Sequence, residues 1–412
     1  MNLLIHDLSV AEWARVADNY KDWTVVADTG GIRPCRGCFH CWVSGTGVCA
    51  VKDGYENMGQ LIHEADEVVV MSRYTYGGFS SFVKNVFDRS LGYVLPEFET
   101  AFGEMHHQKR YAEDKPVTFV FRGAGLTEED KEKARCYVAA VCRNLRGVVK
   151  DVFFEECAPE DGVVPGGEAE SPSADKAALE DTAAFAAPER EMAAPAAPAT
   201  GDAAATTTPE RAGILLIDCS IRGRNSNTRV FLKQLQAYMK SPADLLGLYG
   251  GGSPAQIVTA VANAETVVLG VPLYVDGLPA STLRLLEMVK ACGAGQQCKV
   301  YAVVNNGLYE SRQNENLLSA IKDWCAESGS KYCGALAIGA GEMTGVLMRG
   351  KKWTLWPVRN VKKGLRHLAK TIDARKETID AYADPFVFPR WLYIWIANTS
   401  WRMQKKAAKA RK

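Results

Sequence analysis

Short apolar runs alternate with amphipathic segments on both sides of a long polar stretch near the middle of the chain. Before that stretch, runs rich in β-branched residues predict buried strands, and the segments between them space their apolar residues as helices do. The predicted strands are Leu3–Ile5, Trp23–Val26, Glu67–Ser72, Val117–Arg122 and Val148–Phe154, and the predicted helices include Met58–Glu64, Phe82–Ser90 and Glu128–Leu145.

The same rhythm returns after the polar stretch. Strands are predicted at Gly213–Asp218, Ala243–Leu248, Thr266–Val271, Lys299–Asn305 and Lys331–Ile338, and helices at Thr228–Met239, Ala255–Asn263, Ser281–Lys290 and Glu315–Glu327. Strands this apolar, separated by helices, are typical of a parallel sheet with both faces covered. The pattern predicts an α/β protein with two doubly wound parallel sheets in tandem.

The polar stretch is rich in Ala, Pro, Glu, Asp, Ser and Thr and holds few large apolar groups. Such a composition cannot offset the entropy cost of ordering, so we interpret it as a disordered linker. The predicted division of the chain is a first domain at 1–157, the linker at 158–211, a second domain at 212–345, and a helical, aromatic and basic extension at 346–412.

The two predicted domains also match each other weakly in sequence. Aligning the strand that follows Ala65 with the strand that follows Ala264 brings Gly78 opposite Gly277 without a gap. Self-similarity of this kind favours two copies of one fold over two unrelated domains.

Composition narrows the classes of function. The 412 residues are 47% hydrophobic and 24% charged, with 49 Lys and Arg against 48 Asp and Glu. A net charge of +1 gives no global reason to expect a nucleic-acid partner. The N-terminus has no cationic region or cleavage site typical of a signal peptide, and no apolar run reaches the ~18 residues of a transmembrane helix. We therefore expect a cytoplasmic protein, whose twelve cysteines are thiols or metal ligands and not disulfides.

The loop after the first strand of the second domain is rich in hydroxyl and amide side chains and opens a helix. A helix N-terminus presents unpaired backbone N–H groups and the positive end of the helix dipole, so this loop suits a phosphate. An ordinary N-cap at Ser226 or Asn227 explains the same residues, and both interpretations stay open. Its place beyond a strand's carboxyl end, where doubly wound sheets bind ligands, favours the phosphate.

The run from Ser220 to Thr228, together with the segment Pro272–Leu273–Tyr274–Val275–Asp276–Gly277–Leu278–Pro279, resembles the NADPH-dependent FMN reductase family of flavodoxin-like proteins. The resemblance implies FMN as cofactor and two flavodoxin-like sheets. It implies phosphate contacts from Ser220, Arg222, Ser226, Asn227 and Thr228, and ring contacts from Pro272, Leu273, Tyr274, Asp276 and Gly277. The loop Asn305, Asn306 and Gly307 is expected at the remaining side of the flavin.

Four cysteines cluster in the first domain, after its second strand. Cys35, Cys38, Cys41 and Cys49 have the compact spacing that a thiolate-ligated [4Fe–4S] cluster requires. The spacing resembles that of the iron-sulfur flavoproteins, a branch of the same superfamily. A packed loop, a redox pair of thiols and a zinc site remain open alternatives.

The first domain departs from the family where the phosphate is expected. Its first loop lacks the Ser-Asn-Thr run and carries Asp7 and Glu12, whose negative charges oppose an anion. We therefore expect the first domain not to hold an FMN of its own. One half keeps the phosphate loop and the other the cysteines, so the chain resembles a fused pseudo-dimer in which the first domain covers the flavin of the second; a homodimer is the other arrangement considered.

The leading hypothesis is an FMN-dependent oxidoreductase or electron-transfer flavoprotein. NAD(P)H or a reduced carrier would donate electrons, a small molecule or protein would be the redox partner, and the first domain would pass single electrons if it holds a cluster. No catalytic acid or base is assigned. The alternatives are a non-enzymatic binding or regulatory protein with structural zinc, and an FMN-only quinone or nitro reductase. The aromatic and basic tail from Pro385 suits either docking onto the body or an interfacial membrane helix.

Overall fold

A computed structural model describes residues 1–157, 213–249, 252–350 and 356–410. The predicted linker at 158–211 lies outside these residues. The described residues form two parallel sheets with helices packed on them, which confirms the predicted fold class. The division of the chain at 157, 211 and 345 stays a prediction.

The first sheet holds five parallel strands in the order β2-β1-β3-β6-β7. The strands are β1 (Asn2–His6), β2 (Trp23–Ala27), β3 (Glu67–Arg73), β6 (Pro116–Arg122) and β7 (Val148–Glu155). An antiparallel hairpin of β4 (Val94–Ala101) and β5 (Glu104–Lys109) interrupts the succession. Without the hairpin, this is the strand order of the flavodoxin fold.

Helices of the first half cover its sheet unequally. On one face α3 (Met58–Glu64), α4 (Ser81–Arg89) and α5 (Glu128–Leu145) bury a core that includes Ile5, Val70 and Phe119. The other face packs Leu4, Val69 and Met71 against side chains from α1 (Val10–Val16) and the short helix that follows it. The four-residue helix α2 (His40–Val43) lies within the cysteine segment.

The second sheet holds six parallel strands in the order β13-β12-β11-β10-β8-β9. These are β8 (Ile214–Asp218), β9 (Ala243–Gly247), β10 (Thr266–Pro272), β11 (Lys299–Asn305), β12 (Lys331–Ile338) and β13 (Ala381–Ala383). The first five repeat the flavodoxin order. The sixth, β13, is a strand that the sequence analysis did not predict, and it pairs with β12.

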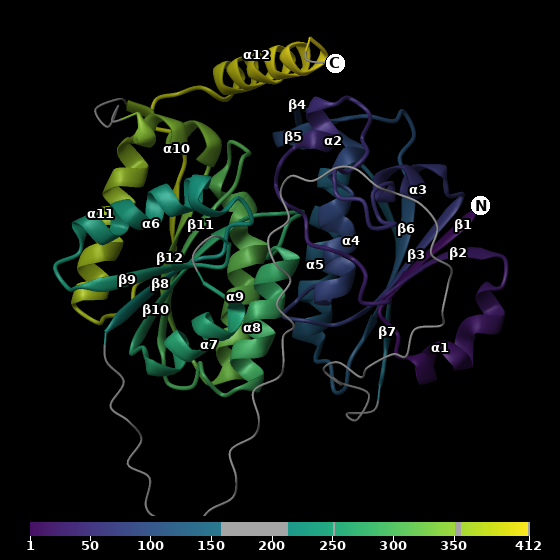
Figure 1. The fold of residues 1–412 in the computed structure, drawn as a ribbon, viewed down its shortest axis with the longest axis horizontal. Helices are drawn as coiled ribbons and strands as arrows, with labels where there is room; N and C mark the ends of the chain where they lie inside the picture. Colours follow the sequence, from purple (N-terminus) through teal and green to yellow (C-terminus); the bar gives the residue numbers. More distant parts are fainter. Residues whose placement is uncertain (158–212, 250–251, 351–355, 411–412) are drawn as a thin grey trace, which may run out of the picture. The chain divides into compact units, whose positions relative to one another are not determined.

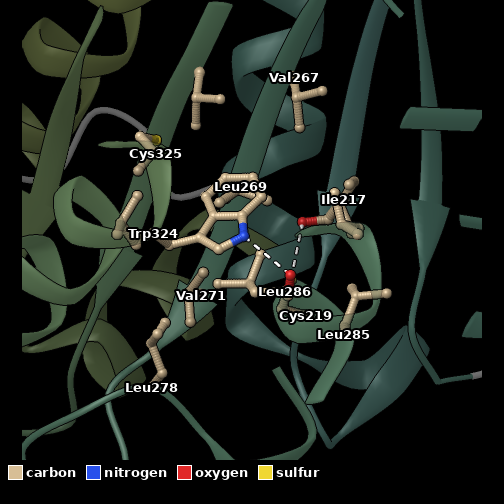
Figure 2. Packing of buried hydrophobic residues seen from close by; sticks show 14 of the residues in the cluster. Ile217, Cys219, Val267, Leu269, Val271, Leu278, Leu285, Leu286, Trp324 and Cys325 are labelled. Carbon is tan, nitrogen blue, oxygen red and sulfur yellow. Dashed lines mark hydrogen bonds between the residues drawn. The ribbon is translucent and has the colours of Figure 1, made fainter. Parts of the chain in front are cut away.

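Both faces of the second sheet are covered by helices (Figure 1). α7 (Pro254–Asn263), α8 (Ala280–Ala291) and α9 (Glu315–Ser328) cover one face, and α6 (Asn227–Tyr238), α10 (Gly341–Arg349) and α11 (Arg359–Asp373) cover the other. Figure 2 shows Trp324 of α9 among apolar side chains of the strands, with its indole Nε1 donating to the carbonyl of Leu286 at 3.0 Å. The last helix, α12 (Arg390–Lys409), follows β13.

The two halves meet through α4 and α8. The carboxylate of Asp88 in α4 accepts a hydrogen bond from the backbone N–H of Ala280, the first residue of α8, at 2.9 Å. Lys84 pairs with the same carboxylate, and all three residues are buried. Asp88 of α4 therefore places a buried carboxylate at the N-terminus of α8.

Candidate functional site

A cavity of about 550 Å³ lies beyond the carboxyl ends of β8, β10 and β11. Its volume falls within the ~300–1,000 Å³ of small-molecule sites. The second half lines it with all the predicted flavin contacts except Ser226 and Gly277. The first half contributes Phe39, Trp42, Leu91, Val94, Phe98, His107, Asn144 and Leu145, and α12 contributes Tyr393, Ile396, Ala397, Ser400, Trp401 and Gln404.

One end of the cavity is formed by the loop between β8 and α6. Ser226 is the N-cap of α6, and its hydroxyl accepts from the backbone N–H of Arg229 at 2.9 Å. That engagement explains why Ser226 does not line the cavity. Asn227 and Thr228, the first two residues of α6, do line it. The first N–H groups of a helix have no partner within the helix, so this end presents donors suited to an anion.

A buried carboxylate lies beneath this loop. Asp218, 1% exposed, accepts from the backbone N–H of Ser220 at 3.1 Å and from the hydroxyl of Ser226 at 3.2 Å. The guanidinium of Arg229 approaches it at 3.6 Å. Burial outweighs these partners and raises the pKa of Asp218 to about 6. Asp218 therefore holds the loop in place.

Two further charged residues surround the anion end. Arg222 lines the cavity, pairs with Glu342 at 2.5 Å and places its guanidinium 5.1 Å from the centre of the Phe39 ring. Arg349, at the end of α10, donates to the carbonyl of Asn225 at 3.0 Å and to the side chain of Asn227. Sequence reasoning missed Glu342 and Arg349 because they lie more than a hundred residues beyond the loop and carry no local motif.

The middle of the cavity is bounded by a tight turn after β10. Tyr274 and Gly277 exchange backbone hydrogen bonds at 3.1 and 3.0 Å, and the two residues between them, Val275 and Asp276, have positive φ of 39° and 58°. A β-branched residue rarely adopts this conformation, so the turn is strained beside the cavity. Gly277, the residue that closes the turn, lines a neighbouring pocket of about 290 Å³ instead.

Two buried polar atoms at the cavity have no hydrogen-bond partner among the described residues. Asp276 is 4% exposed; its Oδ1 accepts from the amide of Asn144 at 2.6 Å, and its Oδ2 is unpaired. Burial raises the pKa of Asp276 to about 6. Asn306 donates to the carbonyl of Glu310 at 2.9 Å, and its Oδ1 is unpaired. Unsatisfied buried atoms are costly, so a polar ligand here would stabilise both.

Aromatic residues that the sequence analysis did not assign form the opposite wall. Phe39 and Trp42 stack with ring centres 5.2 Å apart, and Trp401 of α12 meets both rings edge-on. His107 packs on Trp42 at 4.7 Å, and burial lowers its pKa to about 4, so it is neutral at physiological pH. The cavity thus joins an anion end to an apolar, aromatic end.

The cysteine segment of the first half packs directly on the predicted flavin residues. Gly37, between Cys35 and Cys38, has a φ of 60°, and a Cβ at this position would lie 2.8 Å from both the Cγ of Arg222 and the hydroxyl of Tyr274. Only glycine permits that approach.

The four cysteines are not gathered for metal binding in the described part of the chain, where no group of three or more His, Cys, Asp or Glu side chains is arranged to hold an ion. The Sγ of Cys35 accepts from the N–H of Gly37 at 3.4 Å. Burial raises the pKa of Cys41 to about 12 and that of Cys35 further, so both are thiols at neutral pH in this arrangement. A [4Fe–4S] cluster at these cysteines therefore stays a prediction.

Comparison with known proteins adds little. No model of a protein family and no curated protein matches the sequence. Among solved structures, the chain is similar to the Trp repressor binding protein of Bacillus subtilis, with 12% identity, 31% of this chain and 83% of that chain covered, and a TM-score of 0.26.

It is also similar to the two-electron reduced flavodoxin of Megasphaera elsdenii, with 15% identity over 38% and 98% of the two chains and a TM-score of 0.27. An azoreductase of Bacillus anthracis gives 14% identity, 39% and 99% coverage, and a TM-score of 0.27. Likenesses of this size assign no activity.

No helix among the described residues is both long and apolar enough to cross a membrane.

Proposed function

We propose that this protein is an FMN-dependent oxidoreductase whose flavin binds in the cavity beyond β8, β10 and β11. The observation that carries the proposal is that residues chosen from three separate loops, among them Arg222, Tyr274 and Asn306, line one cavity. The cavity has the two chemistries that FMN requires, namely donors for a phosphate and an apolar, aromatic wall for a ring.

In this proposal, different residues bind the phosphate and the ring of FMN. The N–H groups of Asn227 and Thr228 and the guanidinium of Arg222 bind the phosphate. The turn Pro272–Asp276 and the loop Asn305–Gly307 bind the ring, whose polar edge satisfies Asn306 and Asp276. When bound, FMN supplies transfer of a hydride or of single electrons, and NAD(P)H or a reduced carrier is the expected donor.

The surrounding residues exclude water and hold a proton. Phe39, Trp42 and Trp401 close the aromatic wall, which lowers the local dielectric and strengthens the polar contacts inside. Asp276 is the carboxyl group in the cavity whose pKa lies near neutrality, so it can keep or release a proton at physiological pH.

An FMN-only reductase of quinones or nitro groups is the second candidate. It requires no metal site, and no group of three or more His, Cys, Asp or Glu side chains among the described residues is arranged to hold an ion. The cluster at Cys35, Cys38, Cys41 and Cys49 stays a prediction. Anaerobic purification with quantification of FMN, iron, sulfide and zinc separates these possibilities. Flavin without metal supports the second candidate, and zinc without flavin would overturn both.

The direct test is a binding titration with FMN and with riboflavin, which lacks the phosphate. Asn227→Asp adds a negative charge at the first position of α6, where a carboxylate stabilises the helix but repels a phosphate. We expect FMN binding to weaken about tenfold, corresponding to ~1.4 kcal/mol, while riboflavin binding is unchanged. Asn57→Asp, at the N-cap of α3 in the first half, is the matched control. Equal binding of FMN by both variants would contradict the phosphate assignment.

A further inference from the structure

Helix α12 has one face on the body of the protein and another that no described residue covers. On the inner face, Tyr393 is 4% exposed and donates to the carbonyl of Gly307 at 2.7 Å. Asn398 exchanges two hydrogen bonds with the backbone of Phe98, at 2.7 and 2.9 Å. On the outer face, Trp391 is 68% exposed and Trp395 is 64% exposed. The helix is therefore fixed in place, with two large aromatic side chains directed to solvent.

The exposed residues form a stripe. Trp391, Trp395, Arg402, Lys406 and Lys409 are spaced at four, seven, four and three residues, so they follow one another along one side of a helix. All five are exposed, and we call them the outer stripe. Its tryptophans lie in the first half of α12 and its cations in the second half. Figure 1 shows α12 as one continuous helix, so the stripe is unbroken.

The cations of the outer stripe have no carboxylate partner among the described residues. Lys405, one position away, pairs with Glu97 of the first half and lies at the margin of the stripe. The sequence from Arg402 to Lys412 holds six Lys or Arg and no Asp or Glu, although the whole chain has a net charge of only +1. The positive charge is thus concentrated next to the exposed tryptophans.

Few partners suit this combination. Tryptophan prefers the boundary between lipid and water, where its ring meets acyl chains and its N–H meets headgroups. Unpaired Lys and Arg attract anionic headgroups. A second copy of the outer stripe would bring cations against cations or tryptophans, without a carboxylate to neutralise them. We propose that the outer stripe binds the surface of an anionic lipid bilayer, with α12 lying in the plane of the interface.

This inference does not rest on the proposed flavin chemistry. It does place the bilayer beside the cavity, because Ile396, Ser400 and Trp401 of the same helix line it. Lipid binding and flavin binding are measured separately, so failure of one leaves the other standing.

The experiment is flotation of the full-length protein with vesicles of phosphatidylcholine alone and of phosphatidylcholine mixed with phosphatidylglycerol. We expect binding to the mixed vesicles only, weakening with added salt, and a blue shift of tryptophan fluorescence on binding. Arg402→Gln combined with Lys406→Gln and Lys409→Gln should weaken binding about 100-fold, since each cation near the surface contributes roughly fivefold. Trp391→Ser with Trp395→Ser should also reduce binding and remove the blue shift.

A triple variant of α11 provides the matched control. Lys363→Gln, Arg366→Gln and Lys370→Gln remove the same charge from exposed positions of another helix. Retained binding by this control supports the proposal, and a loss equal to that of the α12 triple variant would overturn it in favour of diffuse attraction. Absence of binding to mixed vesicles would also overturn it. So would a dimer, detected by sedimentation without lipid, that Trp391→Ser with Trp395→Ser dissociates.

Discussion

Two loops at equivalent places in the two sheets show how one local structure serves opposite purposes. β1 lies between β2 and β3, and β8 lies in the same way between β9 and β10; each leads to a helix capped by a serine, Ser9 in α1 and Ser226 in α6. The third helical residue differs: it is Glu12 in α1 and Arg229 in α6. The serine side chain accepts the N–H of that residue in both helices.

The difference decides whether the helix N-terminus remains available to a ligand. In α1, the carboxylate of Glu12 turns back to the N–H of Ser9 at 2.6 Å and pairs with Arg122 at 2.5 Å. This capping box satisfies the helix from within and places a negative charge at its start. In α6, Arg229 instead approaches the buried Asp218, and the first two helical residues, Asn227 and Thr228, line the cavity. The third residue thus determines which loop is suited to an anion.

The strongest way to break this comparison is to give α6 the residue of α1. Arg229→Glu removes a positive charge and adds a negative one in the first turn of α6, directly after Asn227 and Thr228. Because interactions with charged groups contribute ~1.5–3 kcal/mol each, we expect FMN binding to weaken about 100- to 1,000-fold. Fluorescence titration measures the effect, with circular dichroism to verify folding. An equal loss of riboflavin binding would show that the cavity had collapsed and that charge was not the cause.

A second test concerns the carboxylate beneath the α6 loop. Burial raises the pKa of Asp218 from its ordinary value of 3.8 to about 6 in the folded protein. Because the folded pKa is raised, the contribution of Asp218 to the free energy of unfolding is fully present below the unfolded pKa. This contribution is lost as pH rises through the folded pKa. Asp218→Asn cannot ionise. We therefore expect the free energy of unfolding of the variant to gain roughly 2–3 kcal/mol over wild type between pH ~4 and pH ~7.

Thermal and urea unfolding at several pH values test this expectation. The comparison with the first half sharpens it, because His6 occupies the register position of Asp218. Burial lowers the pKa of His6 to about 4, so its contribution is present above its unfolded pKa and is lost as pH falls. If the difference in free energy of unfolding between Asp218→Asn and wild type stayed constant with pH, the raised pKa of Asp218 would be contradicted.

The capping box of α1 gives the third test. Glu12→Gln preserves shape but removes the charge that pairs with Arg122, and we expect a destabilisation of ~1–3 kcal/mol without any new FMN binding. Hydrogen bonds from Ser9 and the pair with Arg122 outweigh burial and lower the pKa of Glu12. Because the folded pKa is lowered, the contribution of Glu12 to stability is present above the unfolded pKa and is lost as pH falls through the folded pKa. The variant should therefore match wild type more closely as pH falls below ~4, which urea unfolding would measure. A constant difference across this range would exclude the charged pair as the cause.

The sequence predicted the parts of this molecule whose signals are local. Apolar runs such as Thr266–Val271 identified every strand of the two parallel sheets except β13, because buried parallel strands are nearly continuous in hydrophobicity. The separate β4–β5 hairpin was not predicted. The alignment of Gly78 with Gly277 proved structurally consistent: each closes a two-residue turn after its strand, at Thr75 and Tyr274 respectively. The capping interpretation of Ser226 was confirmed for the same reason, since a cap depends on three neighbouring residues.

The parts it missed depend on distant contacts. Glu342, Arg349 and the rings of Phe39, Trp42 and Trp401 reach the cavity only after the chain has folded, and no spacing near them indicates a site. The role of the aromatic and basic tail from Pro385 also depends on distant contacts. Its aromatic pattern favoured docking onto the body over an interfacial membrane helix, and the structure divides α12 between a docked face and an exposed one. A pattern along one helix cannot state which of its faces the body will cover.

The smallest effect concerns the turns after β3 and β10, where Gly77 stands opposite Asp276. Both have positive φ, 81° and 58°, which a Cβ disfavours. A Cβ at Gly77 would meet no atom closer than 3.5 Å, so a substitution there tests backbone strain alone. We expect Gly77→Ala to destabilise by ~1 kcal/mol and Gly77→Asn by less, since Asn tolerates the left-handed conformation as Asp does. Urea unfolding of both variants measures the difference. If Ala cost no more than Asn, the strain assigned to the Val275–Asp276 turn would lose its support, and its positive φ would be an ordinary consequence of hairpin geometry.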